Sequence, residues 1–234
     1  MVFEKMEKRL ILSGTIEAVT PLHIGSGKPE MDIGDVDMPI LRAPDGQPYI
    51  PGSSLKGRTR SEVERLAKAS GMDVCTPPSV SDMCGSRKRR PEEFCVACRM
   101  FGTAGSISVA SKLKFRDAYP LKPVDEMLVR AGTAIDRSTG AVARGALYST
   151  EAVPAGTFFG FEAVMENLAP DEVKFLKAAL KSVEDSALGG SSSRGFGKIA
   201  FHFSKLVERS AGFYLGKEKE RVIEGAELEK WFKE

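Results

Sequence analysis

Histidine is the scarcest of the chemically reactive residues in this 234-residue sequence, which holds only His23 and His202. This scarcity leaves little room for a histidine-rich catalytic metal centre. Long apolar runs are also missing: no stretch approaches the roughly 20 residues of a membrane span, and Met1 to Gly14 lacks the apolar block of a signal peptide. We therefore expect a cytoplasmic protein with no membrane partner.

The sequence also lacks a surplus of either charge. Lys+Arg number 34 and Asp+Glu number 32, so the net charge of +2 by itself indicates neither a nucleic-acid nor a membrane partner. The hydrophobic fraction of 42% is ordinary and sufficient for a core. Cysteine is limited to four residues, which in a cytosolic protein are expected to bind metal or stay reduced rather than form disulfides. The length fits one domain with insertions or two small domains.

Apolar periodicity and turn residues predict a βαββαβ order of elements. The predicted elements are a strand over 9–19, a helix over 52–71 capped by Ser53 or Ser54, a strand-like stretch over 107–115, a hairpin over 145–165 that turns at Pro154-Ala155-Gly156, a helix from Pro170 to before Gly189, a strand over 198–207 and a short helix over 228–232. This order predicts an α+β fold with a ferredoxin-like (RRM-like) core, in which two helices cover one face of an antiparallel sheet. The open face of such a sheet commonly binds single-stranded RNA. Segments 72–105 and 120–144 show little periodicity.

A glycine-rich stretch before the last core strand is the sharpest local signal. Arg194-Gly195-Phe196-Gly197-Lys198 approaches the RRM strand pattern, with Lys198 in place of an aromatic residue. It is not a P-loop, because no Lys-Ser/Thr follows the glycine and a strand comes next. We predict RNA contact by Gly190, Arg194, Gly195, Phe196 and Gly197; the alternative is a tight helix-to-strand turn.

The predicted helix start at 53–60 carries Lys56, Arg58 and Arg60 beside the hydroxyls of Ser53 and Ser54. Cations there oppose the helix dipole, and an RNA phosphate would compensate them. The alternative is a solvated face that Glu62 and Glu64 neutralise. Ser53-x-x-Lys56 also matches the nucleophile motif of penicillin-binding proteins, but Met83 stands where the companion motif needs Asn, so we reject that enzyme.

The four cysteines, Cys75, Cys84, Cys95 and Cys98, supply a four-sulfur set that suits tetrahedral zinc. Cys95 and Cys98 have the two-residue gap of ligands on one turn, whereas the upstream spacings are irregular, so free thiols are the alternative. The neighbouring basic run 87–90 is either a solvated loop or a nucleic-acid contact.

The loop 32–39 contains Asp32, Asp35 and Asp37. Carboxylates in such a loop can hold Mg²⁺ through water or accept a proton, although a plain Gly/Asp-rich turn has the same composition. His23, at a strand exit, is either a structural residue or an RNA contact.

Taken together and in order, six motifs resemble the RAMP-superfamily backbone subunit of type III-A (Csm-type) CRISPR interference complexes. The motifs are Leu22-His23-Ile24-Gly25, Gly34 through Pro39, Ile50 through Gly57, Cys98-Arg99-Met100-Phe101-Gly102, Ala134-Ile135-Asp136-Arg137-Ser138-Thr139-Gly140 and the glycine-rich loop up to Gly197. The resemblance implies a single RAMP domain over 1–234. Its inserted segments are about 20–52 (Asp-rich loop), 72–105 (a Cys-rich lid) and 120–150 (a thumb-like hairpin that carries Ile135, Asp136 and Arg137 to RNA).

The resemblance further implies that copies of the chain polymerise along a guide crRNA and cut complementary target RNA with Mg²⁺ or Mn²⁺. The family's catalytic aspartate, two residues before the proline of its loop, maps onto Asp37 and not onto Asp32 or Asp35. A large signalling subunit, small subunits and other RAMP subunits are the implied partners. The near-neutral net charge requires that the basic residues gather on one face. A non-catalytic crRNA scaffold is the second hypothesis, and a guide-processing endonuclease is the third.

Overall fold

The computed structural model describes residues 5–27, 36–88 and 90–233. The strands are β1 (Lys8–Ala18), β2 (Leu113–Phe115), β3 (Leu128–Ile135), β4 (Val142–Ala152), β5 (Phe158–Glu166), β6 (Ile199–Ser210) and β7 (Arg221–Glu224). The α-helices are α1 (Gly52–Ala69), α2 (Cys84–Arg87), α3 (Val96–Phe101), α4 (Pro170–Asp185), α5 (Ala211–Tyr214) and α6 (Gly225–Lys233). Short 3₁₀ turns are η1 (Val80–Asp82), η2 (Pro91–Glu93) and η3 (Ser192–Arg194).

The main sheet has the strand order β2-β5-β1-β6-β7, and every neighbouring pair is antiparallel. The central strand β1 buries Leu10, Leu12 and Ile16 on one face, as alternation over a half-covered strand requires. At Gly14 the pairing with β6 shifts by a bulge, and a Cβ there would collide with the backbone of His202 and Phe203. This glycine therefore permits the close approach of the two central strands.

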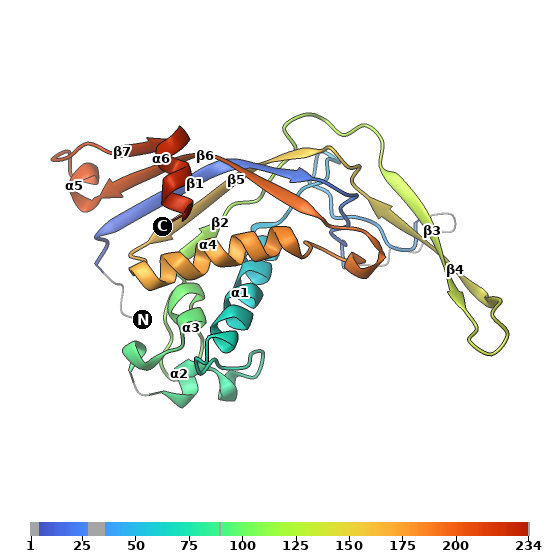
Figure 1. Cartoon of the computed structure of the whole chain (residues 1–234), viewed down its shortest axis with the longest axis horizontal. Helices are drawn as coiled ribbons and strands as arrows, with labels where there is room; N and C mark the ends of the chain where they lie inside the picture. Colours follow the sequence, from blue (N-terminus) through green and yellow to red (C-terminus); the bar gives the residue numbers. More distant parts are fainter. Residues whose placement is uncertain (1–4, 28–35, 89, 234) are drawn as a thin grey trace.

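The two long helices, α1 and α4, lie on one face of this sheet, which confirms the two predicted helices and the mixed α+β class (Figure 1). The predicted serine cap of α1 is wrong. Pro51 is the N-cap residue and the cap position makes no side-chain hydrogen bond. Instead, the Gly52 N–H donates to Oδ1 of Asp117 at 2.7 Å, so a carboxylate from a distant segment satisfies the helix start.

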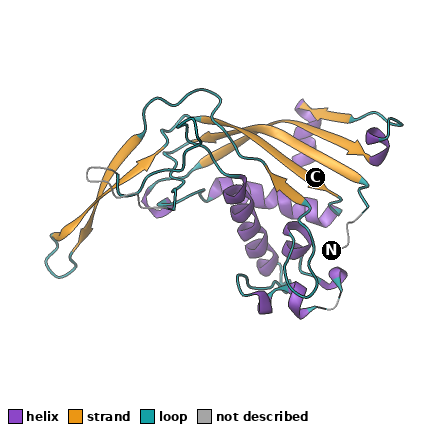
Figure 2. Ribbon diagram, turned by 180° about the vertical axis from the view of Figure 1, so that it is seen from behind, coloured by secondary structure: helices purple, strands orange, loops and turns teal. Residues whose placement is uncertain are grey.

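The hairpin predicted over 145–165 is also wrong in its pairing. The turn at 154–156 does separate β4 from β5, but β5 pairs with β1 and β2, and β4 pairs with β3. Strand β3 lies within 120–144, a segment whose sequence shows little periodicity. The β3–β4 hairpin projects from the main body as a separate two-stranded sheet (Figure 2). Among its side chains, Val129, Ile135, Val142 and Leu147 are exposed.

The Cys-rich segment forms a small helical layer beside and below α1, built from α2, α3 and the 3₁₀ turns η1 and η2 (Figure 1). Its own buried cluster consists of Cys75, Cys84, Phe94 and Cys98, with Cys95, Ile107 and Val109 packed against it. Three of the four buried members of this cluster are cysteines. The apolar side chains of α3, Val96, Ala97, Met100 and Phe101, are buried in the main core instead.

Candidate nucleic-acid interface and metal centre

Asp37 lies exposed at the base of the β3–β4 hairpin, where Ser149 of β4 holds its carboxylate. The backbone N–H of Ser149 donates to Oδ2 of Asp37 at 2.6 Å, and the Ser149 hydroxyl donates to the same oxygen at 2.8 Å. These bonds, the backbone one first, lower the pKa of Asp37 below its ordinary value of 3.8. Oδ1 has no partner from another described residue. Asp32 and Asp35 lie outside the described residues.

The segment that follows Asp37 pairs with β4 in a short ladder. The Met38 N–H donates to the Ser149 carbonyl at 3.0 Å, and the Glu151 N–H donates to the Met38 carbonyl at 3.0 Å. One carboxylate oxygen of Glu151 accepts the Ile40 N–H at 3.0 Å, and the other pairs with Arg42. The Asp37 N–H also donates to the Ser149 hydroxyl at 3.0 Å, so the backbone at Asp37 and directly after it is fixed to the hairpin base.

His23 is buried beside this ladder, and its ring contacts the hairpin. Its Nδ1 lies 2.6 Å from the Glu151 carbonyl, which can only accept, so Nδ1 carries the proton. The Gly190 N–H donates to the His23 carbonyl at 2.8 Å. A Cβ at Gly190 would lie 2.9 Å from Cδ2 of the ring, and one at Gly189 would collide with the His23 carbonyl. The glycines thus let the loop close over His23.

The glycine-rich loop contacts the hairpin base through two cations. Arg194 is exposed and lies 5.3 Å from the Tyr148 ring, and Arg130 lies 4.5 Å from the Phe196 ring. Arg130 also donates to the Arg194 carbonyl at 3.3 Å. Phe196 is only 4% exposed, so its ring is not presented to a base as an RRM aromatic would be. Gly195 has a φ of 88°, and the Gly197 N–H donates to the Pro21 carbonyl at 2.9 Å.

The predicted phosphate contacts of α1 fall into two groups. Ser53 is exposed, Ser54 and Lys56 are half-buried, and Lys56 makes no ion pair with a described residue. Burial, with a smaller contribution from the charge of Arg60, lowers the pKa of Lys56. Arg58 and Arg60, by contrast, face internal partners.

Arg58 pairs with the buried carboxylate of Glu62 at 2.9 Å and donates to the Ser186 hydroxyl of α4 at 2.7 Å. Arg60 donates through Nε to Glu64 at 2.8 Å. Glu62 and Glu64 therefore neutralise Arg58 and Arg60, as the alternative interpretation of the sequence expects. Whether either arginine also contacts RNA stays a prediction.

At the far end of the hairpin, Ile135, Asp136 and Arg137 are exposed. The Asp136 carboxylate accepts the hydroxyl of Ser138 at 2.6 Å and the Ser138 N–H at 2.8 Å, and these bonds lower its pKa. Asp136 therefore shapes the turn. The tip residues are remote from Asp37 along the hairpin, because Asp37 contacts Ser149 near the hairpin base.

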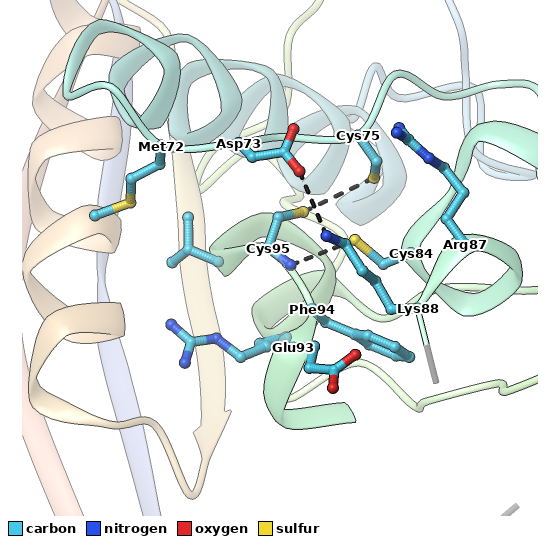
Figure 3. Close-up of a pocket in the computed structure, with 11 residues that line it drawn as sticks. Met72, Asp73, Cys75, Cys84, Arg87, Lys88, Glu93, Phe94 and Cys95 are labelled. Atoms are coloured by element: carbon cyan, nitrogen blue, oxygen red, sulfur yellow. Dashed lines mark hydrogen bonds and ion pairs between the residues drawn. The ribbon is translucent and has the colours of Figure 1, made fainter. Parts of the chain in front are cut away.

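The four cysteines come together in the helical layer, and Figure 3 shows three of them, Cys75, Cys84 and Cys95. Their sulfur atoms all lie within 4.8 Å of one another, with Cys75 3.2 Å from Cys98 and 3.8 Å from Cys95. All four are free of disulfides. Sulfurs at 2.3 Å from one tetrahedral ion would be about 3.8 Å apart, so the donor set fits zinc without a large rearrangement.

The cluster already favours negative charge on one thiol. The hydrogen bond with Cys98 lowers the pKa of Cys95 to about 4, and the same contact raises that of Cys98. Burial raises the pKa of Cys84 to about 11. The Cys95 N–H donates to the sulfur of Cys84 at 3.3 Å, as backbone amides often do around thiolate sites. A cavity of about 250 Å³ beside the sulfurs is lined by charged residues that include Arg87 and Lys88.

Comparison with known sequences decides the family. Residues 15–200 match the profile of the RAMP superfamily. The CRISPR system Cms endoribonuclease Csm3 of Methanocaldococcus jannaschii is 33% identical over 92% of this chain and 88% of the relative. The Csm3 endoribonuclease of Methanothermobacter thermautotrophicus is 33% identical over 94% of each chain. The chain belongs to the Csm3 family of the RAMP superfamily.

Solved structures agree with this assignment. The Csm3 crystal structure from Methanopyrus kandleri superposes with a TM-score of 0.64 at 23% identity over 98% of this chain and 96% of that one, which concerns the fold alone. A Csm3–Csm4 subcomplex of the type III-A CRISPR–Cas interference complex gives a TM-score of 0.58 at 28% identity, covering 98% and 97% of the chains. Within the described ranges, no helix of this Csm3-family chain is long and apolar enough to cross a membrane.

Sequence reasoning missed the residues that hold the candidate site. These residues are Ser149, Tyr148, Arg130 and Glu151, which belong to the hairpin but contact segments that are distant in the sequence. No local motif marks them. A prediction that β3 pairs with β4 would have indicated that these residues lie beside Asp37 and the glycine-rich loop.

Proposed function

We propose that this chain is the crRNA-binding backbone subunit of a type III CRISPR effector complex and that it cleaves complementary target RNA. Its membership of the Csm3 family supports the endoribonuclease activity, and the Csm3–Csm4 subcomplex supports assembly with other RAMP subunits. The observation that carries cleavage is the exposed carboxylate of Asp37, held by Ser149 at the base of the hairpin. Copies of the chain would assemble along the guide, and large and small subunits would complete the complex in the cytoplasm.

The order of elements supports a ferredoxin-like core. Helix α1 connects β1 to β2, helix α4 connects β5 to β6, and the four strands stand in the order β2-β5-β1-β6. In this scheme the helical layer of 72–105 is the lid, and the β3–β4 hairpin is a thumb that inserts into the guide–target duplex through Ile135, Asp136 and Arg137.

RNA phosphates would be held by cations that have no carboxylate partner among the described residues. Lys56 and the exposed Arg194 are the two that we assign, with Ser53, Ser54 and the amides of the glycine-rich loop as further donors. We assign Arg58 to structure, because its guanidinium is engaged by Glu62 and Ser186. His23 supports the loop and reaches RNA at most through Nε2. Sequence would be read by guide pairing, as in other RNA-guided systems.

In the proposed reaction the target's 2′-hydroxyl attacks the adjacent phosphorus. The O2′–P bond forms and the P–O5′ bond breaks. The 2′-hydroxyl loses its proton to solvent water and the leaving O5′ gains one from it, so a cyclic phosphate and a 5′-hydroxyl remain. Asp37 is a weak base, because its pKa lies below 3.8, and a base far below the working pH accepts a proton poorly. Its role is therefore to offer a fixed negative Oδ1 that orients the reacting hydroxyl or holds a cation. Bound Mg²⁺ or Mn²⁺ would place positive charge beside the phosphate. Proteins often hold such an ion through only one or two carboxylates.

We also propose a structural zinc ion held by Cys75, Cys84, Cys95 and Cys98. The support is the sulfur geometry, the absence of disulfides among these residues and the separate buried cluster around them, in which three of four members are cysteines. Zinc would then contribute directly to the folding of the layer.

Cleavage is tested with the assembled, guide-loaded complex and a labelled matching RNA. Asp37→Ala should lower the cleavage rate by about 10²–10⁴-fold, the usual cost of losing a positioned acid–base or orienting group. Assembly and target binding should stay close to wild type, because the side chain is exposed. Regular cuts that vanish with EDTA would support metal dependence.

Two controls accompany the Asp37 variant. Asp45→Ala removes an exposed carboxylate from a nearby turn and should cut normally. Asp35→Ala should be milder than Asp37→Ala; the reverse order would show that the catalytic register is wrong. A wild-type complex that binds guide and target but never cuts would favour the non-catalytic scaffold.

A further inference from the structure

Arg60 is the cation that reaches the four-cysteine cluster. Although it stands on α1 near the proposed RNA contacts, its side chain is only 20% exposed. Its Nη2 donates to the sulfur of Cys98 at 3.8 Å, and its Nη1 donates to the carbonyl of Gly102 at 3.3 Å. Nε remains on Glu64 at 2.8 Å. One guanidinium thus joins α1 to both ends of the α3 turn from Cys98 to Gly102.

The charge of a loaded site explains why such a contact matters. Four thiolates around one Zn²⁺ carry a net charge of −2, and a partly buried dianion is costly unless nearby donors compensate it. Lys88 pairs with Asp73 at 3.5 Å, and Arg99 pairs with Asp171 at 2.9 Å. In the described part of the chain, Arg60 is the cationic side chain with a hydrogen bond to a cluster sulfur.

We propose that Arg60 is a positioning residue of the metal site: it donates to the Cys98 thiolate, offsets the charge of the loaded cluster and fixes the helical layer to α1. This rests on the proposed zinc site and deepens it. It also gives Arg60 a role other than phosphate binding. Residues that orient metal ligands in this way typically contribute about 10–100-fold to metal affinity.

The test measures zinc affinity in the full chain, by competition with a chelator of known affinity. Arg60→Gln should weaken zinc binding by about 10–100-fold. Arg60→Lys should recover part of the loss, because it keeps the charge but not the planar fork that reaches Glu64, Gly102 and Cys98 together. Arg65→Gln is the matched control on the same helix: Arg65 pairs with Glu62 at 3.0 Å and its side chain is 67% exposed. It should bind zinc like wild type.

The outcomes separate the two proposals. Stoichiometric zinc in wild type with unchanged affinity in Arg60→Gln would overturn the role of Arg60 and leave the zinc site standing. A wild-type chain that binds no zinc would remove the site itself. Cobalt substitution adds a spectroscopic reading, because losing the donor to Cys98 should shift the sulfur-to-cobalt charge-transfer band. If Arg60→Gln does not fold, Arg60→Lys decides: affinity and cobalt spectrum identical to wild type would contradict the proposal.

Discussion

At the scale of single residues, Ser149 determines how the Asp37 carboxylate is presented. It saturates Oδ2 with two hydrogen bonds and leaves Oδ1 toward solvent. The backbone bond alone would permit the carboxylate to rotate, whereas the second, from the hydroxyl, fixes its plane. A misplacement of about 1 Å can cost two orders of magnitude in rate.

Ser149→Ala should therefore lower target cleavage by about 10–100-fold with little effect on RNA binding. Ser149→Thr, which keeps a hydroxyl, should retain most of the rate. Single-turnover cleavage by the assembled complex measures both variants. An alanine variant that cuts at the wild-type rate would show that the hydroxyl does not position Asp37.

The low pKa of Asp37 has a consequence for the pH profile. A carboxyl group whose pKa is depressed below 3.8 is fully ionised from about pH 5 to 9, so its protonation cannot shape the rate there. The ratio of wild-type to Asp37→Ala cleavage rates should be constant over this range. Rates measured in a series of buffers check this, and a ratio that rises with an inflection near pH 6–7 would mean that Asp37 acts as a general base.

At the scale of elements, local pattern predicted some features well and others poorly. The helix α1 was predictable within two residues and α4 within three, because each has one apolar face and turn residues near its end. The partner of β4 was not, because a turn at 154–156 fits either a hairpin or two strands that separate after it. Which of the two arrangements forms depends on β1, a strand distant in the sequence that pairs with β5. The cysteine set was predictable as a donor set, but its contact with Arg60 was not.

The helical layer should depend on metal for its stability. Cys95→Ser should lower both the zinc content and the thermal stability, since the layer's buried cluster is mostly sulfur. Metal analysis and thermal unfolding of protein purified without chelator measure the two effects. Near-stoichiometric zinc that persists in Cys95→Ser would remove Cys95 from the ligand set.

At the scale of the whole molecule, the net charge of +2 does not show which cations are held in ion pairs and which are not. Some cations are held in ion pairs with carboxylates, as Arg58, Arg60 and Arg99 are, and these are less available to RNA. Lys56 and Arg194 have no carboxylate partner among the described residues, and we assign them to the proposed RNA path. Affinity in such a protein should depend on a small number of phosphate contacts and on the salt concentration.

Lys56→Ala should weaken RNA binding by a similar factor for RNAs of unrelated sequence, and so should Arg194→Ala. Each variant should also reduce the slope of log affinity against log salt concentration by about one unit. Arg65→Ala should change neither quantity. Binding titrations at several salt concentrations give the slopes. Wild-type affinity and slope in both variants would exclude these residues from the phosphate path.

The β3–β4 hairpin forms a sheet of its own, and this should affect the rate at which its backbone amides exchange with solvent. A two-stranded sheet with exposed apolar side chains, such as Leu147 at 71% exposure, is marginally stable in water by itself. Its backbone amides toward the tip should therefore exchange with deuterium much faster than those of β1, which has a strand on each side. Assembly with RNA or a neighbouring subunit should slow that exchange, so the hairpin would become fully ordered only in the company of its partners.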